Sequence, residues 1–221
     1  MQIAIVLYDH VTALDVIGPY EVFGRLPGAD VTLVGERTGP VTTDTGTPAL
    51  HAYATLDEVT RPDTVVVPGG PGQLAHMADG PIQRWLRQVD QTTTWTTSVC
   101  TGALILASAG LLENRRATTH WLAKDQLAEL GAIPTDERVV FDGKYVTAAG
   151  VSSGIDMALT LIDRMFGDLA SQAVQLGIEY DPQPPYDAGH PDKAPEAVVA
   201  LLRNLRDQVL FGAPNPATPG A

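Results

Sequence analysis

The sequence predicts an α/β protein with a doubly wound, mostly parallel sheet and helices on both faces. Short apolar runs alternate along the chain with stretches of helical periodicity, the order typical of parallel strands joined by crossover helices. Several of these runs are continuously apolar, which indicates strands that are covered on both faces. No internal repeat and no linker divides the chain, so we expect a single domain over residues 1–211 and a disordered tail over residues 212–221.

The individual elements follow from local patterns. Apolar or β-branched runs predict buried strands, at residues 3–7, 30–35, 64–67 and 95–99, and a short strand at 115–119. Helical spacing of apolar residues predicts helices, at residues 11–26, 81–92, 102–112, 120–130, 155–166, 168–177 and 195–210. Residues 36–48 are rich in threonine, glycine and proline and predict a loop or a small hairpin. The proline-rich stretch 180–195 predicts an irregular excursion.

Two of these elements carry further detail. In the first helix, Thr12 or Asp15 is a candidate N-terminal cap, and Pro19 is expected in the first turn. Between residues 137–141 and 145–148 the pair Asp142-Gly143 is a strong hairpin signal.

Composition limits the class of partner and the compartment. The formal net charge is −12, and the absence of a lysine or arginine run argues against nucleic acid or an anionic membrane as the main partner. A single cysteine excludes an internal disulfide, and there is no signal-peptide pattern or long apolar stretch. We therefore expect a cytoplasmic protein. The five scattered histidines offer no familiar ligand spacing, so neither a metal nor a cofactor is expected.

The only cysteine lies where a predicted strand turns directly into a predicted helix. Cys100 follows residues 95–99, and Gly102 lets the chain turn tightly after it. The same arrangement exposes the serine of a nucleophile elbow. Free N–H groups and the positive end of the helix dipole favour a thiolate at such a position. A buried structural thiol is the alternative interpretation of Cys100, and local sequence alone leaves both open.

Three groups are expected at one edge of the sheet, because ligands of such sheets bind at the carboxyl ends of the strands. Asp15 follows the first strand, Gly69-Gly70 follows the strand at 64–67, and Cys100 follows the next. A thiolate that attacks, a carboxyl that moves a proton and amides that receive negative charge would suit covalent catalysis on a polarised carbon. Taken singly, Asp15 also fits a helix cap, Gly69-Gly70 a tight turn, and His120 a histidine at a helix start or in the core.

Several stretches resemble a known family. They are LDVIGPYEV, VVVPGGPG, TSVCTGALILASAGLL, RATTHW, LGAIPTDERVVFDG and QLGIEYDPQPPYDAGHPDKAP. Together they are similar to the PfpI/ThiJ-like branch of the class I glutamine amidotransferase-like superfamily, with its flavodoxin-like fold, over residues 3 to about 195. The resemblance implies that Cys100 is the nucleophile, that Asp15 is its carboxyl partner, and that Thr101 and the Gly70 amide border the site. It also implies a homodimer.

Within that branch the resemblance is closest to members that hydrate isocyanides. It implies a cofactor-independent lyase that converts an isocyanide and water to an N-substituted formamide through a thioimidate on Cys100. Peptidase- and amidase-like relatives carry histidine directly after the cysteine, where this chain has Thr101, and His120 is the remaining candidate histidine. Ile17, Tyr20 and Trp121 are candidates to line an apolar substrate pocket. A cysteine amidase, a glyoxalase-like enzyme, and a non-catalytic redox-sensing or ligand-binding protein are the alternatives.

Overall fold

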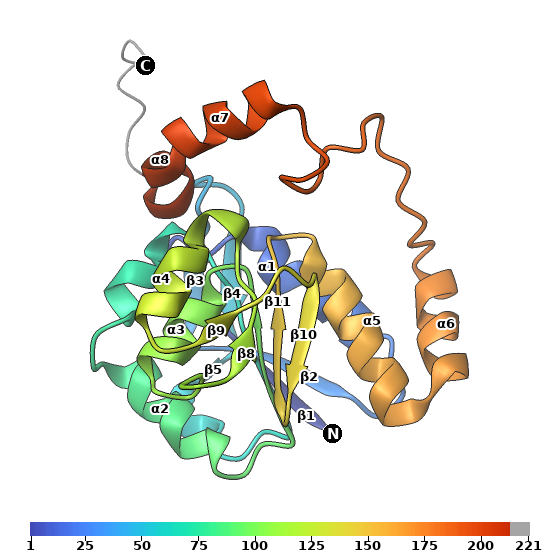
Figure 1. Cartoon of the computed structure of the whole chain (residues 1–221). Helices are drawn as coiled ribbons and strands as arrows, with labels where there is room; N and C mark the ends of the chain where they lie inside the picture. Colours follow the sequence, from blue (N-terminus) through green and yellow to red (C-terminus); the bar gives the residue numbers. More distant parts are fainter. Residues whose placement is uncertain (213–221) are drawn as a thin grey trace.

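A computed structural model describes residues 1–212 and contains one seven-stranded sheet (Figure 1). Its strand order is β10-β11-β7-β6-β1-β2-β5, and every neighbouring pair is parallel except β10 with β11. The strands of this sheet are β1 (Gln2–Val6), β2 (Asp30–Gly35), β5 (Ala54–Thr55), β6 (Thr64–Val67), β7 (Trp95–Val99), β10 (Val139–Asp142) and β11 (Tyr145–Ala148). The predicted α/β class and the 139–148 hairpin are confirmed.

Helices cover both faces of this sheet. Helices α1 (Ala13–Phe23) and α5 (Ser153–Phe166) pack together on one face, while α2 (Pro81–Asp90), α3 (Gly102–Ser108) and α4 (Lys124–Glu129) cover the other (Figure 1). Helix α6 (Asp168–Gly177) packs beside α5 and matches its predicted bounds. The strands at the centre of the sheet are fully buried, as their continuously apolar sequences predict: β1 from Ile3 onward, and β6 throughout.

Smaller elements complete the fold. Two further strand pairs are present, β3 (Gly39–Thr42) with β4 (Ala49–Ala52), and β8 (Arg116–Ala117) with β9 (Ile133–Pro134). Three 3₁₀ turns are η1 (Leu56–Glu58), η2 (Pro71–His76) and η3 (Trp121–Ala123). The small hairpin expected within residues 36–48 therefore exists, and it extends to Ala52. Residues 180–195 are irregular, as predicted.

Three helix predictions need correction. Helix α1 begins at Ala13, so Pro19 lies inside it rather than in its first turn, where it packs against Gly154 of α5. The helix predicted over 102–112 ends at Ser108, because Gly110 turns the chain into the left-handed region at φ +80°. The helix predicted over 120–130 starts as the 3₁₀ turn η3 and becomes α-helical only at Lys124.

The last predicted helix, 195–210, is two helices, α7 (Glu196–Asn204) and α8 (Arg206–Phe211). Leu205 leaves the helical region between them, and Arg206 Nε donates a hydrogen bond to the Leu122 carbonyl at 3.0 Å. That bond holds α8 against η3, near the carboxyl ends of the strands (Figure 1). Apart from Gly212, the tail expected to be disordered lies outside the described residues.

No helix within residues 1–212 is long and apolar enough to cross a membrane. The cytoplasmic location stays a prediction.

Candidate active site

Cys100 sits on a strained turn between β7 and α3. Its backbone adopts φ +56°, a left-handed conformation that is uncommon for residues other than glycine. The Cys100 N–H is held by the carbonyl oxygens of Ala148 and Ala149, at 3.1 and 2.9 Å. Gly102 is required two residues later, since a Cβ there would lie 2.0 Å from the Val67 carbonyl oxygen. The predicted elbow is therefore present.

The backbone N–H groups of Thr101 and Val151, together with the Thr101 hydroxyl, lie close enough to the Cys100 sulfur to lower its pKa in part. Val151 itself has a positive φ, +22°, and follows β11, the strand beside β7. Sequence reasoning missed Val151, although the small-residue turn at 150–154 after a β-strand is a signal of the same kind as the glycine pair after β6.

Asp15 is fully buried in the first turn of α1, next to Cys100. Its Oδ2 accepts a hydrogen bond from the Gly69 N–H at 2.8 Å, and its Oδ1 accepts none from the described protein. Burial raises the pKa of Asp15 from 3.8 to about 8; the Gly69 N–H and the Cys100 side chain lower it in part, and the negative charge of Asp44 adds to the rise. Asp15 is thus a neutral acid at pH 7, with Oδ1 available to carry the proton.

The same burial corrects one expectation about the cysteine. The start of α3 was expected to favour a thiolate, but burial raises the pKa of Cys100, and the neighbouring Asp15 charge raises it further. The nearby Thr101 and Val151 groups lower the pKa of Cys100 but do not overcome burial. The resting thiol therefore keeps its proton, and thiol and carboxyl titrate as a coupled pair.

The glycine pair after β6 is packed against the site, and its amides are already used. The Gly70 N–H donates to Thr101 Oγ1 at 3.0 Å, while the Gly69 N–H serves Asp15. A Cβ on Gly69 would lie 2.5 Å from the Thr101 nitrogen and 3.0 Å from Asp15 Oδ2, so only glycine fits. The Gly70 amide contacts Thr101, the residue after Cys100, and is not a free donor for an oxyanion.

The His120 ring packs against Gly150, in the turn that follows β11. A Cβ on Gly150 would meet its ring at 3.0 Å, and its Nδ1 accepts a hydrogen bond from the Leu122 N–H at 3.3 Å. Burial lowers the pKa of His120 to about 4, so its ring is neutral at pH 7. It is therefore poorly suited to supply a proton in that range.

The pocket role of Ile17, Tyr20 and Trp121 stays a prediction. Ile17 and Tyr20 are on the solvent-facing side of α1, 38% and 39% exposed. Trp121 lines a small cavity with the C-terminal segment that includes Ala188 and Val198. A larger cavity, about 300 Å³, opens beside the ends of β1 and β2, with Tyr8 in its lining and neither Asp15 nor Cys100.

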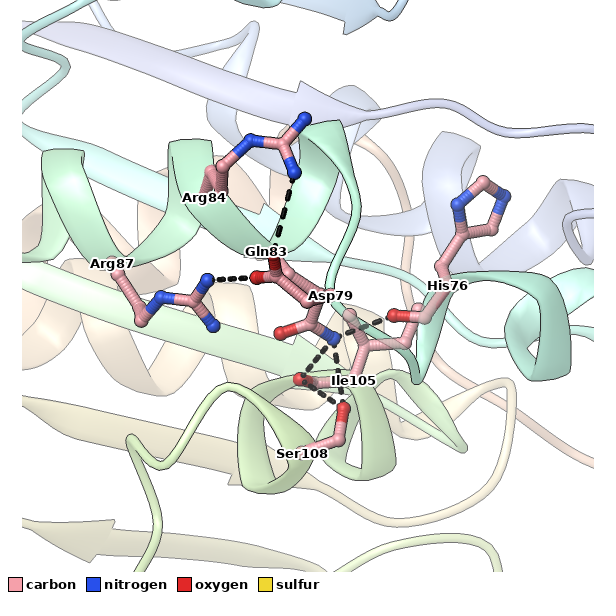
Figure 2. A network of polar contacts seen from close by, with 7 residues as sticks. All are labelled: His76, Asp79, Gln83, Arg84, Arg87, Ile105 and Ser108. Carbon is pink, nitrogen blue, oxygen red and sulfur yellow. Dashed lines mark hydrogen bonds and ion pairs between the residues drawn. The ribbon is translucent and has the colours of Figure 1, made fainter.

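A buried glutamine ties the elements behind the site together (Figure 2). Gln83 of α2 donates through Nε2 to the His76 carbonyl at the end of η2, and to the Ile105 carbonyl and Ser108 hydroxyl of α3 at 3.2 and 2.8 Å. The turn that follows the glycine pair is thereby fixed to the helix that follows Cys100. Among residues 1–212, no group of three or more His, Cys, Asp or Glu side chains is placed to hold a metal ion.

Comparison with known proteins identifies the family of this chain. The model of the DJ-1/PfpI family matches residues 1–164. The chain belongs to the DJ-1/PfpI family. It is 45% identical over 203 residues to the isonitrile hydratase of Pseudomonas putida, covering 92% of this chain and 89% of that protein.

A further relative and a solved structure define the family likeness. The HTH-type transcriptional regulator CdhR of Pseudomonas aeruginosa is 34% identical over 64% of this chain and 42% of its own length. The crystal structure of a THiJ/PfpI family protein from Pseudomonas syringae superposes with a TM-score of 0.91 at 37% identity, covering 95% of this chain and 87% of that one. The resemblance to the PfpI/ThiJ-like branch is confirmed.

Proposed function

We propose that this chain is a lyase that hydrates isocyanides (isonitriles) to N-substituted formamides. The proposal is supported by the isonitrile hydratase of Pseudomonas putida, to which the chain is similar over nearly its whole length. The single observation that carries it is the neutral Asp15 carboxyl next to the Cys100 thiol, with Oδ1 free of other donors. A proton donor and a sulfur nucleophile are what the terminal carbon of an isocyanide needs, because that carbon has a lone pair and is also electrophilic.

In the first step the S–H bond of Cys100 adds across the terminal carbon. Asp15 gives its Oδ1 proton to the carbon as the sulfur attacks the same atom, and the carboxyl group receives the thiol proton. A C–H bond and a C–S bond form, the S–H bond breaks, and the product is a thioimidate, R–N=CH–S–Cys100. Asp15 ends the step neutral, so the protein carries no net charge change through it.

In the second step water displaces the sulfur. The neutral Asp15 gives its proton to the thioimidate nitrogen and takes one proton from the water, whose oxygen bonds to the carbon. The C–S bond then breaks as the proton of the new hydroxyl group moves to the sulfur, which leaves R–NH–CHO, the resting thiol and a neutral Asp15. Neither step requires a metal or an organic cofactor, and His120 has no part in either.

The proposal is tested by turnover of a panel of small alkyl and aryl isocyanides, with the formamide identified as product. The Cys100→Ser variant is the matched control, because serine is nearly the same size and far less nucleophilic. Formamide production by the wild type alone supports the proposal. Turnover of amides or of small dicarbonyl compounds without isocyanide turnover would favour an amidase or a glyoxalase, and no turnover of any of them would favour a binding or redox-sensing protein.

The expected homodimer is part of this proposal, with α1 at the interface. Leu14, Ile17 and Tyr20 form an exposed apolar stripe along that helix, each about 40% exposed. A second copy of the chain over this stripe would bury it, including two of the residues expected to line the pocket. Sedimentation equilibrium tests this: the wild type is expected as a dimer, and Ile17→Asp should shift it toward monomer.

A further inference from the structure

The loop of the β3–β4 hairpin is fastened to the turn that leads into α1. The Asp44 N–H donates to the Val11 carbonyl at 3.0 Å, and the His10 N–H donates to the Thr42 carbonyl at 2.7 Å. Val11 and Thr43 form an isolated parallel bridge, and Thr43 is fully buried. This docking brings a second carboxyl group, that of Asp44, to the start of the helix that carries Asp15.

The start of α1 departs from ordinary capping in order to hold that carboxyl. Thr12 is the N-cap residue, yet its side chain makes no hydrogen bond to the first N–H groups of the helix. Its hydroxyl donates instead to Asp44 Oδ2 at 2.7 Å. An N-cap threonine normally accepts from those N–H groups, so the hydroxyl is used here to fix an anion beside the site. Local rules broken in this way cluster at functional sites.

We propose that Asp44 is a positioning residue for the catalytic pair: its carboxylate, fixed by Thr12, holds the exchangeable proton on Asp15. The effect of Asp44 on catalysis rests on the proposed hydration. The effect of its charge on Asp15 does not depend on that proposal. The first step of that reaction begins with a neutral Asp15, so a nearby fixed negative charge enlarges the fraction of molecules ready to react.

Burial and three neighbouring groups determine the charge state of Asp15. The Gly69 N–H and the Cys100 side chain lower its pKa, while burial and Asp44 raise it. The Tyr8 hydroxyl donates a hydrogen bond to the Pro68 carbonyl at 2.8 Å. Burial, and then the charges of Asp15, Cys100 and Asp44, raise the pKa of Tyr8 well above its ordinary value of 10. Tyr8 is therefore neutral, and Asp44 is the fixed anion of the set. Replacing it by a neutral residue should move the Asp15 titration to lower pH.

The test follows alkylation of Cys100 by iodoacetamide against pH, which needs no isocyanide substrate. Ionisation of Asp15 changes the reactivity of the adjacent sulfur, so the wild-type profile should show an inflection near pH 8. The Asp15→Asn variant tests whether the inflection comes from Asp15, because the inflection should then be absent. In Asp44→Asn, which keeps an acceptor for Thr12, the inflection should move to lower pH. Asp44→Glu keeps the charge and should leave it in place.

Asp9→Asn is the matched control. Asp9 lies in the same turn, accepts a hydrogen bond from the Thr42 N–H of the same hairpin at 3.4 Å, and does not contribute to the pKa of Asp15. An unchanged inflection in Asp44→Asn, or an equal shift in Asp9→Asn, overturns the proposal. If Asp44→Asn does not fold, Asp44→Ser takes its place. Where isocyanide turnover exists, the alkaline limb of kcat/KM should shift with the alkylation profile; if no turnover exists, only the proposed function fails.

Discussion

Asp15→Asn should stabilise the protein at neutral pH while it removes activity. In the folded chain the pKa of Asp15 is about 8, against 3.8 for an ordinary aspartate. Between these values the folded state binds a proton that the unfolded state has released. Unfolding therefore becomes easier as pH rises from about 4 to about 8, by about 1.4 kcal/mol per pH unit.

At pH 7 this amounts to a penalty of about 4 kcal/mol, an upper value because the buried pair is coupled. Asparagine carries no such penalty, since it matches the neutral carboxyl in size and its Oδ1 can still accept from Gly69. We expect Asp15→Asn and the wild type to have similar free energies of unfolding near pH 4, and the variant to be more stable by a few kcal/mol at pH 7.

Urea unfolding at several pH values between about 4.5 and 8 measures the difference directly, with m-values checked for two-state behaviour. If Asp15 were an ionised helix cap, the two curves would run parallel, or the variant would be the less stable at pH 7. Either result would refute the neutral-acid role. The kcat/KM for an alkyl isocyanide, measured on the same samples, should fall by roughly 10²-fold or more in the variant.

The other predictions concern residues around this pair. Cys100→Ser should fold and lose hydration by roughly 10³-fold or more, measured by formamide formation; near wild-type turnover would exclude covalent catalysis. His120→Ala should keep kcat/KM within roughly tenfold of wild type, because its buried ring is neutral at pH 7 and Asp15 is assigned the proton transfers; a loss as complete as that of Cys100→Ser would restore a Cys–His mechanism. Gln83→Ala should lower the free energy of unfolding by about 1–3 kcal/mol, whereas Asp79→Asn, in the exposed ion pairs of the same network, should not change it measurably.

The features that could be predicted from the sequence are those set by residues close together in the chain. A β-branched strand followed by a small-residue helix places Cys100 on a turn, and strand–helix alternation places Asp15 and Gly69 at the same edge. The effect of the Val151 N–H on the Cys100 pKa depends on β11 lying next to β7. Strand order cannot be predicted from any local sequence pattern. Asp44 approaches Asp15 only because a hairpin more than 25 residues farther along the chain docks on the turn before α1.

The sign of the cysteine's pKa shift could not be predicted for the same reason. A helix start after Cys100 is visible in the sequence, and its dipole favours the thiolate. The opposing effect, burial, depends on how α1, β6 and β11 close around the turn, and Cys100 is only 5% exposed when they do. Burial has the larger effect because a helix of seven residues and the nearby Thr101 and Val151 groups do not replace the hydration of a free thiolate.

The amides of the glycine pair are occupied, so they cannot serve as the oxyanion donors of an acyl-transfer enzyme. An amidase needs free N–H donors aimed at an oxyanion, and removing one donor costs about 10²–10³ in rate. Here the Gly69 amide binds Asp15 and the Gly70 amide binds Thr101, at 2.8 and 3.0 Å. Addition of a thiol to an isocyanide carbon creates no oxygen anion; it needs a proton at that carbon instead. In the proposed hydration, the glycine-pair amides fix the neutral carboxyl group and a threonine beside a protonated thiol, and that carboxyl group delivers the proton to carbon.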